Sequence, residues 1–307
     1  MLTTALPTAL NLDQAAGNLL ELGYTRLICP SLPPRFPKLV VEFAEISEDG
    51  RRKLLVIPHL REQHADGTND LGFREVRRGN IKKNPRTDEI AEGRTKYDET
   101  KFVLHFNARA LGYWSGHDAE ELLREHEQFF FELSLVQSES MLIGYEIAER
   151  FDHLLPGYGF VKRMHEAEYL ARLRLLRYLC DGVEPSIAQR HRDQCFLTIH
   201  IRSDRPGLWL ANKDHTQIIE DAQETREDSV LIFLGRKAWE ITNGKLDGII
   251  HGVLDPTFGE AGRTPRHTAV SFLHATVRDE EQGWGTNNIH QLVIPQHVSD
   301  YGLRITA

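Results

Sequence analysis

The stretch "RHRDQCFLTIHIRSDRPGLWLAN", residues 190–212, combines a strand-like apolar run with charged residues that a buried strand does not ordinarily carry. The segments "CFLTIHI" and "GLWLA", separated by the turn sequence "DRPG", are typical of two short β-strands. A polar group that is buried without a partner costs free energy. The triplet His191-Arg192-Asp193 therefore lies either in solvent ahead of the strand or next to something in the interior that uses it.

Further short, β-rich segments follow along the chain after residue 180. They are "SVLIFLGRKAWEI", "GIIHGVL" and "HTAVSFLHATV". The pair Asn243-Gly244 predicts a type I′ hairpin between two of them. Several short strands at this spacing predict an antiparallel barrel or sandwich.

The first half of the chain has helical patterning instead. "LDQAAGNLLELG" predicts an amphipathic helix that ends at Gly23, and "YTRLICP" predicts a strand directly after it. Residues 118–151 have the apolar period of a helix, and "EAEYLARLRLLRYL" fits either a further helix or a helix that runs into a strand. Residues 60–100 are polar and predict a loop or lid. We expect the two halves to pack interdependently.

Composition restricts the class of protein. The chain has 307 residues and a net charge of -8, which disfavours nucleic-acid binding because phosphate contacts require clustered cations. No apolar run reaches the length of about 18 residues that a membrane helix needs, and the N-terminus lacks the pattern of a secretory leader. Three widely spaced cysteines are typical of a reducing compartment. We expect a cytoplasmic protein, monomeric or a weak homo-oligomer, without membrane or nucleic-acid partners.

Two sets of residues have the types and spacing of a chemical site. His191 and Asp193 are two residues apart, so on a strand their side chains share one face, and His251 lies in a strand-like segment of its own. Two imidazoles and one carboxylate on one side of a metal suit non-haem iron(II) and oxygen chemistry. Arg266 and Thr268 also share a strand face, where a guanidinium and a hydroxyl suit a bound carboxylate.

The order of these pieces resembles the iron(II)- and 2-oxoglutarate-dependent oxygenases, most closely their isopenicillin N synthase-like branch. The matching pieces are His191-x-Asp193, Leu197-Thr198, Pro206-Gly207-Leu208, His251, and Arg266-x-Thr268 with Phe272. The resemblance implies a mainly β fold with α: a double-stranded β-helix (jelly-roll) core under a helical N-terminal layer. We expect an N-terminal accessory region with a lid loop at 1–170, the oxygenase core at 171–275 and a C-terminal tail that packs on the core at 276–307.

The same resemblance implies the roles of the site residues. His191, Asp193 and His251 would bind iron(II), and 2-oxoglutarate would be held at its far carboxylate by Arg266, Thr268 and Tyr178, with oxygen as the second co-substrate. A small molecule would then be hydroxylated, desaturated or cyclised, in biosynthesis of a natural product or a modified amino acid. Three departures are Thr268 in place of serine, Leu176 in place of an asparagine, and a longer segment between His251 and Arg266. None of them removes a metal ligand.

Two alternatives remain open on sequence: an iron-dependent oxidase that does not use 2-oxoglutarate, and a non-catalytic β-barrel that holds a metal. The substrate is not identified. The basic segment Arg74–Arg86 favours an anionic one, so we expect substrate contacts from Lys82, Lys83 and Arg86, with Tyr97, Lys101 and Phe106 as further candidates. The strand histidines His200, His267 and His274 are interpreted as structural.

Overall fold

The computed structural model describes residues 6–54, 71–77, 100–115, 119–180, 186–211, 218–220, 228–255, 257–258 and 264–277. In these ranges the helices are α1 (Leu12–Leu22), α2 (Phe36–Glu45), α3 (Glu48–Lys53), α5 (Arg109–Ser115), α6 (Glu120–Glu125), α7 (Glu127–Leu154), α8 (Phe160–Glu166) and α9 (Arg236–Thr242). Two 3-10 turns, η1 (Pro33–Arg35) and η2 (Glu168–Leu170), join helices to their neighbours.

Within the described residues, the strands form one sheet of eight and one of four. The larger sheet has the order β1-β2-β10-β7-β12-β5-β4-β3. Its strands are β1 (Thr8–Ala9), β2 (Tyr24–Ile28), β3 (Gly72–Val76), β4 (Lys101–Phe106), β5 (Arg172–Tyr178), β7 (Leu197–Ser203), β10 (Ser229–Leu234) and β12 (Arg266–Leu273). The smaller sheet has the order β6-β11-β8-β9, with β6 (Ser186–His191), β8 (Leu208–Ala211), β9 (Ile218–Glu220) and β11 (His251–Leu254). Strands β1 and β2 are parallel, and the other neighbouring pairs in both sheets are antiparallel.

The start of the chain forms the helix and strand that its sequence predicts. The Asn11 side chain accepts a hydrogen bond from the Gln14 backbone N–H at 2.9 Å and so caps α1. The helix ends at Gly23, whose φ of 84° lies in the left-handed region that glycine adopts without strain. Strand β2 begins at the next residue, so this short cap brings β2 back onto the sheet beneath α1.

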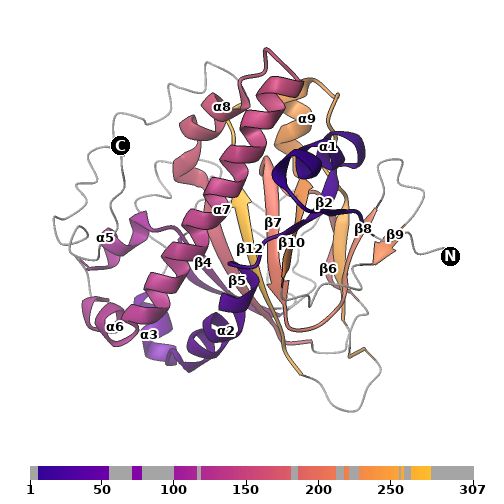
Figure 1. The fold of residues 1–307 in the computed structure, drawn as a ribbon. Helices are drawn as coiled ribbons and strands as arrows, with labels where there is room; N and C mark the ends of the chain where they lie inside the picture. The colour runs from indigo at the N-terminus through magenta and orange to yellow at the C-terminus, as the bar shows by residue number, and fades with distance from the viewer. Residues whose placement is uncertain are drawn as a thin grey trace, which may run out of the picture.

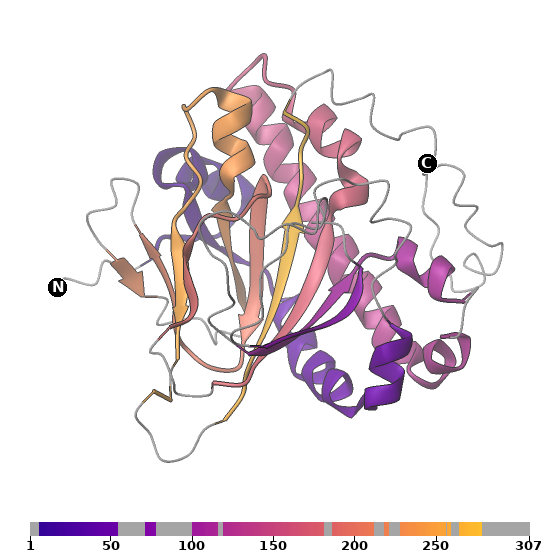
Figure 2. The ribbon, with the colours of Figure 1, turned by 180° about the vertical axis from the view of Figure 1, so that it is seen from behind.

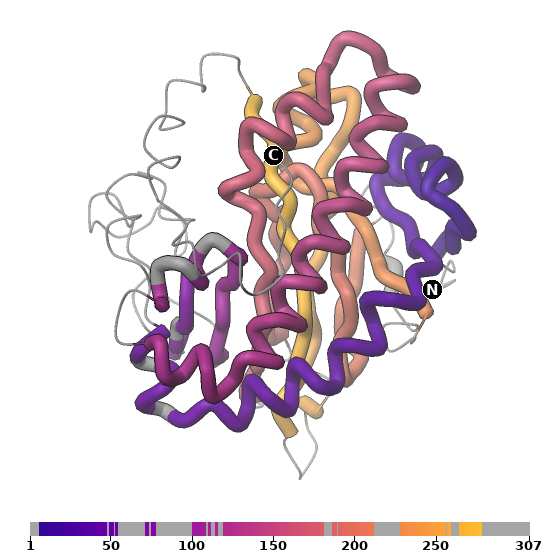
Figure 3. The backbone as a smooth tube through the Cα atoms, turned by 60° about the vertical axis from the view of Figure 1, so that its left-hand side comes forward, coloured from indigo at the N-terminus to yellow at the C-terminus, as the bar shows by residue number. Residues whose placement is uncertain are grey.

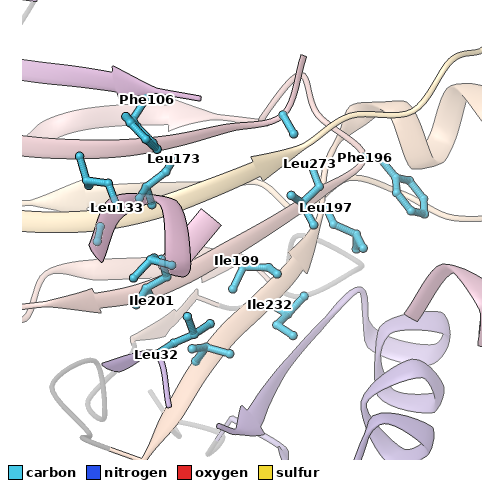
Figure 4. Packing of buried hydrophobic residues seen from close by; sticks show 14 of the residues in the cluster. Leu32, Phe106, Leu133, Leu173, Phe196, Leu197, Ile199, Ile201, Ile232 and Leu273 are labelled. Carbon is cyan, nitrogen blue, oxygen red and sulfur yellow. The ribbon is translucent and has the colours of Figure 1, made fainter. Parts of the chain in front are cut away.

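The helices cover one face of the eight-stranded sheet. Figure 1 shows α1, α2 and α7 in front of the strands, and Figure 2 shows the strands from behind with the helices on the far side. In Figure 3 the long helix α7 runs beside the strands. Buried side chains of α7, such as Leu133, pack on strand residues such as Leu173, Leu197 and Ile199 (Figure 4). Burial of this apolar layer stabilises the fold.

Alternate residues of the same strands point into the space between the two sheets. A second apolar cluster lies there and includes Leu176, Leu210, Leu231, Phe233 and Val270. It joins strands of both sheets, which is the two-sheet arrangement of a jelly roll. The fold class expected from the sequence is therefore confirmed.

The structure differs from the sequence-based expectation in three places. "RKAWEI" forms α9 and does not continue strand β10, and Asn243-Gly244 ends that helix and does not form a hairpin turn. Asn243 has the left-handed φ of 50° at the C-cap of α9, a conformation that asparagine adopts at helix ends as well as in turns. Segment 60–100 is not all loop, because Gly72–Val76 pairs with β4 as an edge strand.

The N-terminal part of the chain contributes strands to the large sheet as well as the helices that cover it. Strands β1 and β2 extend one edge of the large sheet beyond β10, and β4 and β3 extend the opposite edge beyond β5. Residues 278–307 lie outside the described part of the chain, as does most of 60–100. Among the described helices, none has the length and apolarity to cross a membrane.

Candidate metal centre and carboxylate site

His191, Asp193 and His251 meet between the two sheets. His191 is the last residue of β6 and is paired with His251, the first residue of β11, so the sheet register alone places the two rings side by side. Their ring centroids are 4.3 Å apart. Asp193 lies just after β6, where the chain crosses to β7 in the other sheet. One potential ligand atom from each of the three residues lies within 4.8 Å of the others.

The donor set suits one divalent ion. His191 Nε2 is 3.5 Å from one Asp193 oxygen, and His251 Nε2 is 3.5 Å from the other. Adjacent ligands of one ion are about 3 Å apart when each bond is about 2.1 Å long. His251 Nδ1 lies 3.2 Å from the Ile249 carbonyl, and donation to that carbonyl leaves Nε2 with the lone pair a metal needs. The three residues therefore fit a mononuclear metal with two imidazoles and one carboxylate.

The loop that carries Asp193 is held by the start of α9. The backbone N–H of Arg236 donates to the Asp193 carbonyl at 2.8 Å, and that of Lys237 donates to the Cys195 carbonyl at 3.1 Å. These are N-terminal helix groups without partners inside the helix. Gly235 comes so close to this loop that a Cβ would lie 2.1 Å from the Cys195 oxygen. The backbone position of Asp193 thus depends on a glycine far along the chain.

Arg192, between the two expected ligands, is directed away from them. Its Nε donates to the Gly248 carbonyl at 2.8 Å, and its Nη2 donates to Asp247 at 3.1 Å. It therefore ties the β6–β7 connection to the segment that leads into His251. These two hydrogen bonds hold the Arg192 side chain on the opposite side from those of His191 and Asp193, although β6 ends at His191.

The Asp193 side chain is fixed by a hydroxyl. Thr198 Oγ1 donates to Asp193 Oδ2 at 2.7 Å and also contacts the Cys195 sulfur at 3.1 Å. Burial by itself would raise the pKa of Asp193, but His251, His191 and the Thr198 hydroxyl outweigh it and hold that pKa well below its usual range. Burial lowers the pKa of His251. A carboxylate beside a neutral imidazole is the protonation state that binds a metal.

The three side chains differ in their access to solvent. The His191 side chain is 43% exposed, whereas those of Asp193 and His251 are 10% and 7% exposed. Phe233 covers the His251 ring at a centroid distance of 4.7 Å. The open side of the cluster is therefore the side of His191, and the other side is enclosed by apolar groups.

Arg266 and Thr268 lie together on β12, facing the smaller sheet. Arg266 is 1% exposed and Thr268 is 4% exposed. Arg266 Nη1 donates to Thr268 Oγ1 at 2.5 Å, and Arg266 Nε faces the carbonyl of Arg205 at 3.2 Å. A guanidinium buried in this way, with a hydroxyl beside it, suits a carboxylate ligand.

Tyr178 and Lys101 lie beside Arg266 on the next two strands of the large sheet. Tyr178 on β5 is opposite Arg266 on β12 and opposite Lys101 on β4. The Lys101 ammonium lies 5.4 Å from the centroid of the Tyr178 ring. Lys101 therefore lies on the same face as the proposed carboxylate site.

Of the other expected substrate contacts, the structure describes Phe106 alone, and it is not on this face. Phe106 is 0% exposed and packs under the helices, with its ring 6.4 Å from that of Trp114. It lies in the helix-covered core (Figure 4), on the opposite face of β4 from Lys101. Residues Lys82, Lys83, Arg86 and Tyr97 lie outside the described part of the chain.

Sequence reasoning missed two polar residues at the carboxylate site. His200 Nε2 lies 3.1 Å from Ser203 Oγ, which lies 2.8 Å from Thr268 Oγ1. Alternation from Thr198 could have placed His200 on this face, since the two are two residues apart. It could not have placed Ser203 there, because a register shift of β7 against β12 between His200 and Arg202 turns Ser203 inward.

Comparison with solved structures identifies the fold. The chain is similar to a dioxygenase for auxin oxidation from Arabidopsis thaliana, crystallised with 2-oxoglutarate (TM-score 0.60, 16% identity, 89% of this chain and 93% of that one). It is also similar to a putative oxygenase from Shewanella oneidensis (TM-score 0.63, 15% identity, 98% and 100%). A third similar structure is a full-length Neurospora crassa protein in complex with α-ketoglutarate and 5-formyluracil (TM-score 0.55, 13% identity, 86% and 78%). No family model matches the sequence, and no match is found among curated proteins.

Proposed function

We propose that this protein is a non-haem iron(II)- and 2-oxoglutarate-dependent oxygenase that acts on a small molecule. The observation that carries the proposal is the convergence of His191, Asp193 and His251 between the two sheets, with potential ligand atoms within 4.8 Å. The buried pair Arg266 and Thr268 on the neighbouring sheet supports 2-oxoglutarate as the co-substrate. The similar solved structures support both assignments, because two of them are complexes with 2-oxoglutarate, also called α-ketoglutarate.

Iron(II) bound with 2-oxoglutarate and oxygen would supply the oxidising chemistry. The residues of this chain have the other tasks. His191, Asp193 and His251 would hold the metal through two imidazoles and one carboxylate. Thr198 and the start of α9 keep Asp193 in place. Phe233 and the apolar cluster around it exclude water from the enclosed side.

Arg266 would bind the far carboxylate of 2-oxoglutarate with its guanidinium fork, and Thr268 would add a hydroxyl donor. Tyr178, opposite Arg266 in the sheet, would line the same site. An arginine in a dry site binds a carboxylate more strongly than in water because little solvent competes. These groups therefore fix the orientation of the co-substrate relative to the metal.

For the reaction outcome we propose hydroxylation, with desaturation or ring closure by the same site as variants, in biosynthesis of a natural product or modified amino acid. For the substrate we propose an anion, supported by the basic segment Arg74–Arg86 in a chain of net charge -8 and by Lys101 next to Tyr178. Neutralising Lys82, Lys83 and Arg86 together should raise the KM for such a substrate and lessen its salt dependence. An unchanged KM would remove this segment from the substrate site.

We further propose a cytoplasmic enzyme, monomeric or weakly associated, whose partners are small molecules. The three cysteines support a reducing compartment, since all are buried free thiols.

The decisive experiment measures succinate release over a panel of amino acids, peptides and secondary metabolites, with iron(II) and with or without 2-oxoglutarate. We expect turnover that requires both. Oxygen uptake that needs iron but not 2-oxoglutarate would identify an oxidase instead. Iron binding without an anaerobic absorption band on addition of 2-oxoglutarate, and without turnover, would identify a binding module.

A further inference from the structure

A continuous hydrogen-bonded chain leads from the carboxylate site into the large sheet. Arg266 Nη1 donates to Thr268 Oγ1, Thr268 Oγ1 lies 2.8 Å from Ser203 Oγ, and Ser203 Oγ lies 3.1 Å from His200 Nε2. None of the four residues is more than 5% exposed. We name His200, Ser203 and Thr268 the relay.

Each contact in the relay requires one proton between its two heavy atoms. Arg266 is a permanent donor, so Thr268 accepts from it in every state. The Ser203 hydroxyl has one proton. If it donates that proton to His200, Thr268 must donate its own proton to Ser203, and no proton of Thr268 remains for a ligand. If His200 donates to Ser203 instead, Ser203 donates to Thr268, and the proton of Thr268 is free.

A neutral His200 can take either arrangement, and a carboxylate beside Arg266 favours the second, because a carboxylate accepts hydrogen bonds and cannot donate them. Burial, followed by the charges of Arg266 and Arg26, lowers the pKa of His200 well below its ordinary value. A neutral imidazole carries its proton on one nitrogen only, so the tautomer of His200 sets the direction of the whole relay.

We propose that His200 and Ser203 are positioning residues for the co-substrate carboxylate: His200 Nε2–H donates to Ser203, Ser203 donates to Thr268, and Thr268 thereby presents its proton to the anion beside Arg266. This inference rests on the proposed function, since the anion is the far carboxylate of 2-oxoglutarate. It assigns a role to a histidine and a serine that do not touch the co-substrate themselves.

The first test is the affinity of the anaerobic iron(II) protein for 2-oxoglutarate, followed by its absorption band. Ser203→Ala and His200→Leu should each weaken binding by about 3- to 10-fold, the effect of losing one neutral hydrogen bond. His200→Gln, whose amide can donate in place of Nε2–H, should restore most of the affinity. Binding of 2-oxopentanoate, which lacks the far carboxylate, should be the same in all four proteins.

Ser271→Ala is the matched control. Ser271 is a fully buried serine of the neighbouring strand β12, and its hydroxyl has no hydrogen-bond partner among the described residues, so its removal should leave both affinities unchanged. If wild type bound no 2-oxoglutarate, the proposed function and the relay would both be overturned. If wild type bound it and Ser203→Ala bound it equally well, only the relay would be overturned. Tighter binding by His200→Leu would mean that His200 accepts from Ser203, which also overturns the relay.

The second test needs no variant and so does not depend on folding of a mutant. Nitrogen-15 NMR of wild-type protein loaded with zinc(II) and 2-oxoglutarate reports the tautomer of each neutral histidine. We expect His200 to carry its proton on Nε2. The Nδ1–H tautomer in the loaded protein would overturn the proposal.

Discussion

The two faces of the eight-stranded sheet are made by alternate residues of the same strands, yet they have opposite chemistry. On β7, Leu197, Ile199 and Ile201 face the helices and belong to the large apolar core. Thr198 and His200 face the smaller sheet, where they hydrogen-bond to Asp193 and Ser203. The helix-covered face is stabilised mainly by apolar packing, whereas the inter-sheet face keeps polar groups buried that require partners. Neighbouring residues of one strand therefore serve different purposes: one packs in the apolar core and the next faces the candidate site.

The largest expected effect tests the inter-sheet face at the proposed metal ligands. His251→Ala and Asp193→Ala should each abolish iron binding and turnover, because two remaining ligands do not hold the ion in place. The fold should survive, since these residues contribute little to the helix-covered core. Iron content after gel filtration and the circular dichroism spectrum are the measurements. A His251→Ala protein with the iron content and rate of wild type would show that the ligand set is wrong.

The helix-covered face is tested at Phe106. Phe106→Ala should lower the free energy of unfolding by about 3–5 kcal/mol, as expected for a fully buried aromatic residue. Phe131→Ala is the control, because Phe131 on α7 is 40% exposed and its removal should cost less than about 1 kcal/mol. Urea denaturation gives both values. A stable Phe106→Ala protein with a raised substrate KM would instead place Phe106 in the substrate site.

Substitutions of Arg266 test whether this buried guanidinium binds a ligand or only stabilises the fold. Arg266→Ala should raise the requirement for 2-oxoglutarate by roughly 30- to 1000-fold, the equivalent of losing about 2–4 kcal/mol from a buried charged pair. Arg266→Lys, which keeps the charge but loses the fork, should lie between this variant and wild type. Thr268→Ala should cost about tenfold or less. Steady-state KM for 2-oxoglutarate is the measurement, and an unchanged value in Arg266→Ala would favour the oxidase alternative.

The smallest expected effect is the pH dependence of stability that results from burying His200 in its neutral form. The unfolded chain takes up a proton at His200 near pH 6.5, whereas burial prevents this uptake in the folded protein until a much lower pH. Stability should therefore fall as the pH drops below 6.5, by up to about 1.4 kcal/mol per pH unit from this residue. His200→Leu should lose that part of the slope. Urea denaturation between about pH 7 and pH 5 in the presence of a chelator measures it. Equal slopes for both proteins would contradict a neutral, buried His200.

Much of the fold followed from the sequence because local signals were strong. The helix 12–22 and the strand after it follow from apolar period and a terminal glycine, and both are present. Other local signals had two physical meanings. Asn243-Gly244 favours a left-handed backbone, which serves a hairpin or a helix end equally well. "SVLIFLGRKAWEI" is apolar over most of its length, so its division into β10 and α9 depends on the contact of Gly235 with the Asp193 loop.

By itself, the sequence determined the residue types of the site and their order: His191, Asp193, His251, Arg266 and Thr268. Only the tertiary structure decided which of them meet and what supports them. The pairing of β6 with β11 brings the two histidines together, and the crossing between sheets brings Asp193 to them. A register shift in β7 turns Ser203 to the site face, against the alternation that would place it with Ile199 and Ile201. The physical reason is that strand period fixes faces only within regular pairing, whereas bulges and sheet partners are set by contacts between segments far apart in the chain.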